Sequence, residues 1–175
     1  MNVTSLAISG QCSSGKSTLG KLLATKLGWN YVSVGEEFKR LAAEQGLPIE
    51  DFGSIPEKVL RAVDIQNETR IQTEHNVIWD GRLTCYLARK YSYVFKVYCT
   101  ANFEIRAQRT ATRDHLSFHE AKLKVLARDQ EEKEVFRRLY NISKLQNMKW
   151  VNLIIDTSFY SPENLTLKVL KASRV

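Results

Sequence analysis

The sequence predicts an α/β fold in which a five-stranded parallel sheet is flanked by helices on both faces. Short runs of β-branched and aromatic residues recur along the chain, and longer segments with apolar residues at i, i+3 and i+4 separate them. The 175 residues, 43% of them apolar, suffice for a single domain with its own core. Strands that alternate with helices favour parallel pairing, because each helix returns the chain to the edge where the next strand begins.

The expected strands are short runs bounded by polar or helical segments. They cover residues 4–9, 30–34, 76–79, 93–99 and 151–155. The expected helices cover residues 16–27, 36–45, 56–74, 83–90 and 103–113. A charge-rich helical pattern runs from 117 to 145, and Pro162 marks the first turn of a last helix that ends near Lys171. Gly46, Pro48, Gly53 and Pro56 indicate a loop between the second and third helices.

Composition excludes several classes of protein. No apolar run reaches the roughly 18 residues of a membrane span, and the N-terminus lacks a signal-peptide pattern. Cys12, Cys85 and Cys99 lie far apart without the spacing of a metal site, which indicates reduced thiols. We therefore expect a cytoplasmic protein with no membrane partner. The net charge of +7 favours anionic ligands, and nucleotides, RNA and acidic surfaces all fit it equally.

Residues 10–17 match the phosphate-loop pattern G-x-x-x-x-G-K-[ST] in full, between the first expected strand and the first expected helix. The glycines let successive backbone N–H groups turn toward phosphate oxygens, and the helix N-terminus adds its positive end. Lys16 brings a charge to the β and γ phosphates, and Ser17 offers a hydroxyl to Mg²⁺. ATP and Mg²⁺ are the expected cofactors. The candidate nucleotide-binding residues are Gly10, Gln11, Cys12, Ser13, Ser14, Gly15, Lys16, Ser17 and Thr18.

Further motifs follow this loop along the chain. Residues 33–39 read S-V-G-E-E-F-K, and residues 80–82, directly after the third strand, read D-G-R. Residues 106–109 read R-A-Q-R and residues 128–132 read R-D-Q-E-E. Residues 154–158, at the end of the last strand, read I-I-D-T-S. Together with the phosphate loop they resemble the cytidylate kinase family of nucleoside monophosphate kinases, particularly its compact archaeal-type members. The resemblance implies a three-layer P-loop kinase fold with a small helical lid. It also implies γ-phosphoryl transfer from ATP to a nucleoside monophosphate, and CMP or dCMP is the acceptor that it favours most.

The resemblance assigns the acceptor nucleotide to residues on three segments, and residues 35–75 are expected to form the acceptor-binding helices. Ser33 belongs to the first segment, and Lys39 stands in the place of an arginine that grips the acceptor phosphate. A lysine keeps the charge but loses the bidentate fork, so Arg40 is a possible substitute. Asp80 and Arg82 follow the third strand, where ligands of open α/β sheets gather. Asp80 is expected to hold Mg²⁺ with Ser17, or an acceptor hydroxyl.

Arg128 and Glu132 complete the expected acceptor site by binding its phosphate and sugar. The family carries another arginine three residues after Glu132, and this chain has Val135 there. Arg137 or Arg138 are candidates to replace it from the next helical turn. If neither arginine replaces it, the acceptor site differs from that of a cytidylate kinase.

Residues 106–128 are the expected lid, and its arginines would close over the donor phosphates. Arg106, Arg109 and Arg113 follow helical spacing and share one face, although a basic run is also typical of a solvated helix surface. The expected catalytic residues are Lys16, Arg106, Arg109 and Asp80.

Two other functional classes fit parts of the sequence. One is another small P-loop kinase, acting on AMP, dTMP, shikimate, gluconate or dephospho-coenzyme A. The other is an RNA-associated assembly factor with a slow P-loop ATPase, which the basic charge permits. Because the chain has no aromatic-rich strand motif or arginine/glycine tail, we expect no nucleic-acid partner. We expect a monomer whose partner is a small nucleotide.

Overall fold

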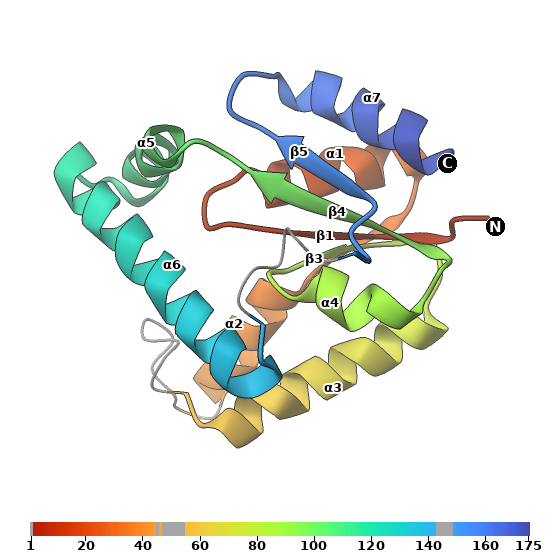
Figure 1. Cartoon of the computed structure of the whole chain (residues 1–175), viewed down its shortest axis with the longest axis horizontal. Coiled ribbons are helices and arrows are strands. Elements are labelled where there is room, and N and C mark those ends of the chain that lie inside the picture. The colour runs from red at the N-terminus through yellow and green to blue at the C-terminus, as the bar shows by residue number, and fades with distance from the viewer. Residues whose placement is uncertain (1, 45, 47–54, 143–148) are drawn as a thin grey trace.

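The computed structural model describes residues 2–44, 46, 55–142 and 149–175. A five-stranded sheet with strand order β2-β3-β1-β4-β5 forms its centre, and every pairing is parallel (Figure 1). The strands are β1 (Ser5–Gly10), β2 (Asn30–Ser33), β3 (Val77–Asp80), β4 (Val94–Thr100) and β5 (Leu153–Asp156). All the predicted strands are confirmed, with bounds that shift by one or two residues.

Helices cover both faces of this sheet, which confirms the three-layer prediction. They are α1 (Lys16–Leu27), α2 (Val34–Glu44), α3 (Glu57–Thr73), α4 (Thr84–Leu87) with the 3-10 turn η2 (Ala88–Lys90), α5 (Phe103–Asp114), α6 (Phe118–Tyr140) and α7 (Pro162–Ser173). Figure 1 shows α1 and α7 on one face and α3 and α4 on the other. Among the described residues, none of these helices is both long and apolar enough to cross a membrane.

The core lies in two layers because the side chains of each strand alternate between the faces of the sheet. Leu6 and Ile8 of β1 pack with α1 and α7, whereas Ala7 between them belongs to the cluster under α3 and α4. All three are fully buried. A strand buried on both faces reads as a continuous apolar run, which is why β1 is apparent in the sequence.

Helix α6 is shorter than predicted. The charge-rich pattern suggested helix from 117 to 145, but the helix ends at Tyr140 and Asn141 caps it with a left-handed backbone, φ 55°. The N–H of Asn141 bonds the carbonyls of Phe136 and Arg137, which satisfies acceptors at the end of the helix. At the other end Ser117 and Glu120 form a capping box. Residues 143–145, Gln45 and the predicted loop over 47–54 lie outside the described residues.

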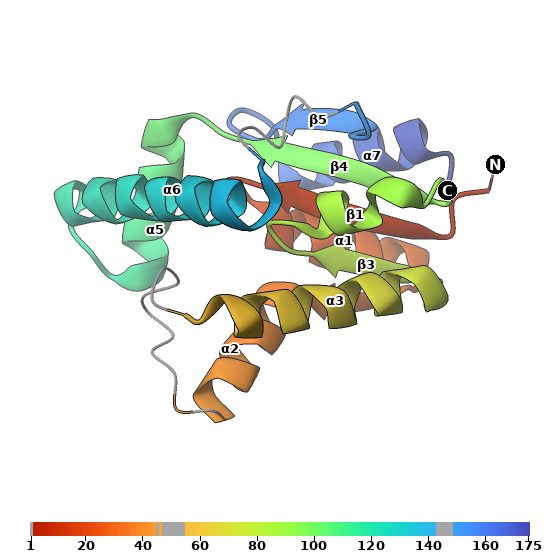
Figure 2. The same cartoon turned by 60° about the horizontal axis from the view of Figure 1, so that its bottom comes forward.

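The carboxyl ends of the strands position the site. Gly10 ends β1 opposite Cys99 of β4, and Ile8 of β1 lies opposite Asp80 of β3. The phosphate loop and the D-G-R segment therefore leave the sheet at the same edge, as expected for ligand sites in open α/β sheets. Helices α5 and α6 project beyond this edge (Figures 1 and 2).

Candidate active site

A cleft of about 1290 Å³ lies at the carboxyl edge of the sheet. The phosphate loop, α2, the first half of α3, the segment after β3, α5 and α6 contribute to its walls. Pockets for a single small ligand usually measure about 300–1,000 Å³. The cleft is therefore larger than is usual for one small ligand.

Most of the predicted site residues line this cleft. They are Cys12, Ser13, Ser14, Gly15, Lys16, Ser17, Thr18, Ser33, Lys39, Asp80, Arg82, Arg109 and Arg128. Five predicted residues do not line it: Gly10, Gln11, Arg40, Arg106 and Glu132. Gly10 ends β1, and the carbonyl of Gln11 accepts a hydrogen bond from Lys16. The other three residues form ion pairs: Arg40 with Glu44, Arg106 with Asp129 and Glu132 with Arg82.

The phosphate loop curls between β1 and α1 through left-handed backbone at Ser13, φ 56°, and Gly15, φ 81°. The ammonium of Lys16 reaches back into the loop and donates to the carbonyl of Gln11 at 2.7 Å. Burial of this ammonium lowers the pKa of Lys16, an effect that Arg82 increases and that Asp80 and Glu132 oppose. The bond to Gln11 holds the Lys16 side chain at the floor of the cleft, where the phosphates of a nucleotide would meet it.

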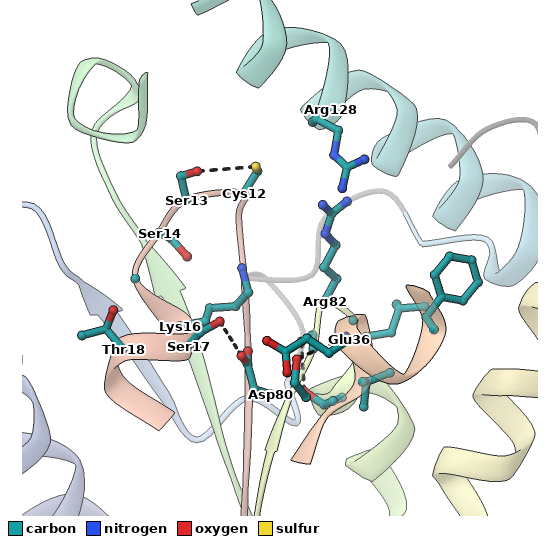
Figure 3. A pocket seen from close by; sticks show the side chains of 18 of the residues that line it. Cys12, Ser13, Ser14, Lys16, Ser17, Thr18, Glu36, Asp80, Arg82 and Arg128 are labelled. Carbon is teal, nitrogen blue, oxygen red and sulfur yellow. Dashed lines mark hydrogen bonds between the residues drawn. The ribbon is translucent and has the colours of Figure 1, made fainter. Parts of the chain in front are cut away.

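Asp80 is buried beside the first turn of α1, with 3% of its surface exposed. Its Oδ2 accepts a hydrogen bond from Ser17 Oγ at 2.6 Å (Figure 3). The same oxygen accepts a second hydrogen bond from the hydroxyl of Tyr31, also at 2.6 Å. Its Oδ1 is buried and has no hydrogen-bond partner among the described residues. A buried carboxylate oxygen without a donor, next to a serine hydroxyl, fits a bound cation such as Mg²⁺.

Tyr31 was not predicted as a site residue. Burial and its bond to Asp80 raise the pKa of Tyr31 well above its ordinary value, so the hydroxyl remains a donor. The ring packs over α1 at Gly20, where an added Cβ would come within 2.9 Å of the ring atom Cε2. The contact depends on β2 pairing with β3, and strand order is not apparent in the sequence.

A second basic group faces the phosphate loop across the cleft. Figure 3 shows the side chains of Arg82, from the segment after β3, and Arg128, from α6, extended toward each other. Arg82 forms an ion pair with Glu132, which is 8% exposed. Burial raises the pKa of Glu132, and the neighbouring Arg82 opposes that shift. Glu132 therefore supports Arg82 from behind and does not itself line the cleft.

The lid arginines have three different environments. Arg109 lines the cleft and donates to Thr157 Oγ1 at 2.9 Å and to the Thr157 carbonyl at 2.8 Å. Arg113 also lines it, while pairing with Asp114 at 2.6 Å. Arg106 is 4% exposed and does not line the cleft, and it forms a bidentate pair with Asp129 at 2.9 and 2.8 Å. Arg109 and Arg113 therefore line the cleft as predicted lid residues, whereas Arg106 lies behind its wall.

Arg106 links the phosphate loop to helices α5 and α6. It lies on α5, its partner Asp129 lies on α6, and its Nη1 also reaches the carbonyl of Cys12 at 3.4 Å. Thr157, which had no predicted role, joins the loop from the other side by donating to the Ser14 carbonyl at 2.8 Å. The D-T-S motif was the signal for Thr157, but its contact spans 143 residues.

Three basic residues proposed around the acceptor lie outside the cleft. Arg40 is exposed and pairs with Glu44 one turn along α2. Arg137 and Arg138 are exposed on α6 and do not line the cleft. Val135 is 2% exposed and belongs to the apolar cluster with Phe136. Neither arginine takes the position that Val135 leaves without charge.

Comparison with known proteins identifies the family of this chain. A model of the cytidylate kinase-like family matches residues 5–159, which include every predicted site residue. The cytidylate kinase of Ignicoccus hospitalis is 34% identical over 164 residues, 92% of this chain and 94% of that protein. The cytidylate kinase of Sulfolobus acidocaldarius is 32% identical over 163 residues, 91% of this chain and 88% of that protein.

The fold also matches solved structures of low sequence identity. A shikimate kinase from Acinetobacter baumannii superposes with a TM-score of 0.63 at 17% identity, over 97% of this chain and 92% of that chain. This likeness concerns the fold alone and confirms the predicted P-loop kinase architecture.

Proposed function

Because the chain belongs to the cytidylate kinase-like family, we propose that it is a nucleoside monophosphate kinase that phosphorylates CMP or dCMP with ATP. An oxygen of the acceptor phosphate forms a bond to the γ-phosphorus as the bond from that phosphorus to the β–γ bridging oxygen breaks. The products are ADP and CDP or dCDP. One observation carries the proposal most directly: a phosphate loop and a second pair of arginines face each other across one cleft.

The donor would lie on the phosphate loop. Backbone N–H groups of residues 12–17 and the start of α1 would hold the phosphates, and Lys16 would meet the β and γ groups. Arg109 and Arg113 line the same end of the cleft from α5. Closing the lid over residues 106–128 would bring these charges onto the transferring group and exclude water.

The acceptor would lie between α2, α3 and α6. Arg82 and Arg128 would hold its phosphate in line with the donor, and Lys39 lines the same cleft from α2. A nucleotide phosphate has a second pKa near about 6, so at neutral pH it is already largely dianionic. No residue is needed to remove a proton from the attacking oxygen, and alignment with charge stabilisation accounts for the chemistry.

Ser17 and Asp80 would hold Mg²⁺. When bound, the ion offsets the negative charge that develops on the phosphoryl oxygens during transfer. Tyr31 donates to Asp80 Oδ2 alongside Ser17, which leaves Oδ1 turned to a site without a protein donor among the described residues. Tyr31 is thus a positioning residue for Asp80.

The direct test is ADP release from ATP·Mg²⁺ with CMP, dCMP, UMP, AMP, GMP and dTMP supplied singly. We expect CMP or dCMP to give the highest kcat/KM. Turnover with AMP or dTMP alone would identify another nucleotide kinase. If no monophosphate accelerated ADP release, the proposed function would be wrong, and shikimate-type acceptors or RNA would be tested next.

We expect Tyr31→Phe to raise the Mg²⁺ concentration for half-maximal rate by roughly 10-fold, because a hydrogen bond to a charged group is worth about 1.5–3 kcal/mol. Initial rates over a Mg²⁺ titration at saturating CMP provide the measurement. Tyr93→Phe is the matched control, since that hydroxyl bonds the carbonyl of Gln72 away from the cleft. Equal Mg²⁺ curves for Tyr31→Phe and the wild type would exclude the positioning role.

A further inference from the structure

Part of the cleft has an apolar wall. This wall is formed by Leu60 and Val63 of α3, Leu87 of α4, and Val135, Phe136 and Leu139 of α6. The position at which the family carries an arginine is Val135, so this chain has extended the apolar wall where a charge was expected. Such a wall suits a flat ring and not a phosphate.

Asp64 of α3 lies on this wall. It is the one carboxylate among the described residues that α3 and the last two turns of α6 contribute to the cleft. Its Oδ2 accepts a hydrogen bond from the hydroxyl of Tyr140 at 2.5 Å. No other donor among the described residues bonds it, although the carboxylate has room for several. Asp64 therefore keeps acceptor capacity toward the cleft.

The contacts around Asp64 hold it in place without neutralising it. Arg61, one turn earlier on α3, lies over the Tyr140 ring at 5.6 Å, donates to the Leu139 carbonyl at 3.0 Å and pairs with Glu57. Within the described part of the chain, Arg61 forms its ion pair with Glu57 and none with Asp64. Burial raises the pKa of Asp64 to about 6, while Tyr140 and Arg61 oppose the shift and Glu68 adds to it.

The position of Asp64 along the cleft separates it from the phosphate site. Glu132, which supports Arg82, and Tyr140, which holds Asp64, are eight residues apart on α6, a rise of about 12 Å. A phosphate held by Arg82 is therefore distant from Asp64, and the nucleotide extends toward it with the base leading. A carboxylate at that end would also repel a second phosphate.

From this geometry we propose that Asp64 is the specificity-determining residue for the acceptor base, accepting a hydrogen bond from its exocyclic amino group. The inference rests on the proposed kinase function and identifies how that site selects its substrate. Cytosine presents an amino group at C4, whereas uracil presents a carbonyl oxygen there. An oxygen facing this half-buried carboxylate leaves both acceptors without a donor, which is unfavourable.

The test is the ratio of kcat/KM for CMP to that for UMP at pH 8, in the wild type and in Asp64→Asn. An asparagine amide can donate to the uracil oxygen, so we expect the CMP/UMP ratio to fall by roughly 10- to 100-fold. Glu68→Gln is the matched control. It removes a carboxylate one turn farther along α3, where Glu68 pairs with Lys90 at 3.5 Å outside the cleft, and its ratio should equal that of the wild type.

A second measurement uses the wild-type protein and requires no variant. As the pH falls through about 6, Asp64 takes up a proton and becomes a donor, so the CMP/UMP ratio should fall. Ionisation of the acceptor phosphate affects both nucleotides equally and cancels in the ratio. In Asp64→Asn this pH step should disappear.

The two levels of the proposal fail in different ways. A wild type that phosphorylates CMP, with a ratio unchanged by pH and by Asp64→Asn, would overturn the role of Asp64 and leave the kinase function standing. A wild type without activity on any monophosphate would overturn both.

Discussion

Lys16→Ala is expected to lower the rate of CMP phosphorylation by about 10²- to 10³-fold, the usual cost of removing one preorganised group that stabilises developing charge. Lys16 is held at the floor of the cleft by its bond to the Gln11 carbonyl at 2.7 Å. Because its charge is near the β and γ phosphates before and during transfer, its loss should raise the KM for ATP and lower kcat. Initial rates over an ATP titration separate the two effects.

Lys26→Ala provides the matched control for this prediction. Lys26 is an exposed lysine in the last turn of the same helix, α1, and it does not line the cleft. Its replacement removes one positive charge and should leave the rate within about twofold of the wild type, since a screened surface charge contributes little. A Lys16→Ala rate within tenfold of the control would mean that another group carries the charge on the γ phosphate.

Gly10→Ala is expected to cost at least about 4 kcal/mol of folding free energy, which places it among the exceptional single substitutions. A Cβ at Gly10 would lie 2.1 Å from the carbonyl oxygen of Cys99 and 2.9 Å from its carbonyl carbon and amide nitrogen. The backbone there has φ 148°, which L residues rarely adopt. Because the whole stability of a domain is about 5–15 kcal/mol, much of the protein should fail to fold.

The mechanism of this loss is specific to the sheet. Gly10 pairs with Cys99 at the end of β1, between the central strands, so the methyl group can be accommodated only by separating β1 from β4. Gly35→Ala is the control, since an added Cβ there meets nothing within 4 Å and φ is not positive. Denaturant unfolding should show Gly35→Ala as neutral or slightly stabilised. Equal midpoints for the two variants would contradict the predicted clash.

Helices, strands and the phosphate loop were predictable because the signals that specify them are local. Apolar periodicity and β-branched runs located the elements to within one or two residues over most of the chain. Residues 10–17 could be assigned because their conformation depends on glycines and on the strand and helix next to them. The end of α6 was missed because the helical sequence pattern continues beyond Asn141, the residue that caps the helix.

The partners of the site residues depend on contacts between distant segments, and no local pattern encodes them. The strand order brings Tyr31 of β2 to Asp80 of β3, and the packing of α5 on α6 pairs Arg106 with Asp129. The crossing of α3 and α6 places Asp64 on the apolar wall that Val135 extends. Residue types that perform the chemistry are thus apparent in the sequence, whereas their partners follow from tertiary packing that joins residues far apart in the chain.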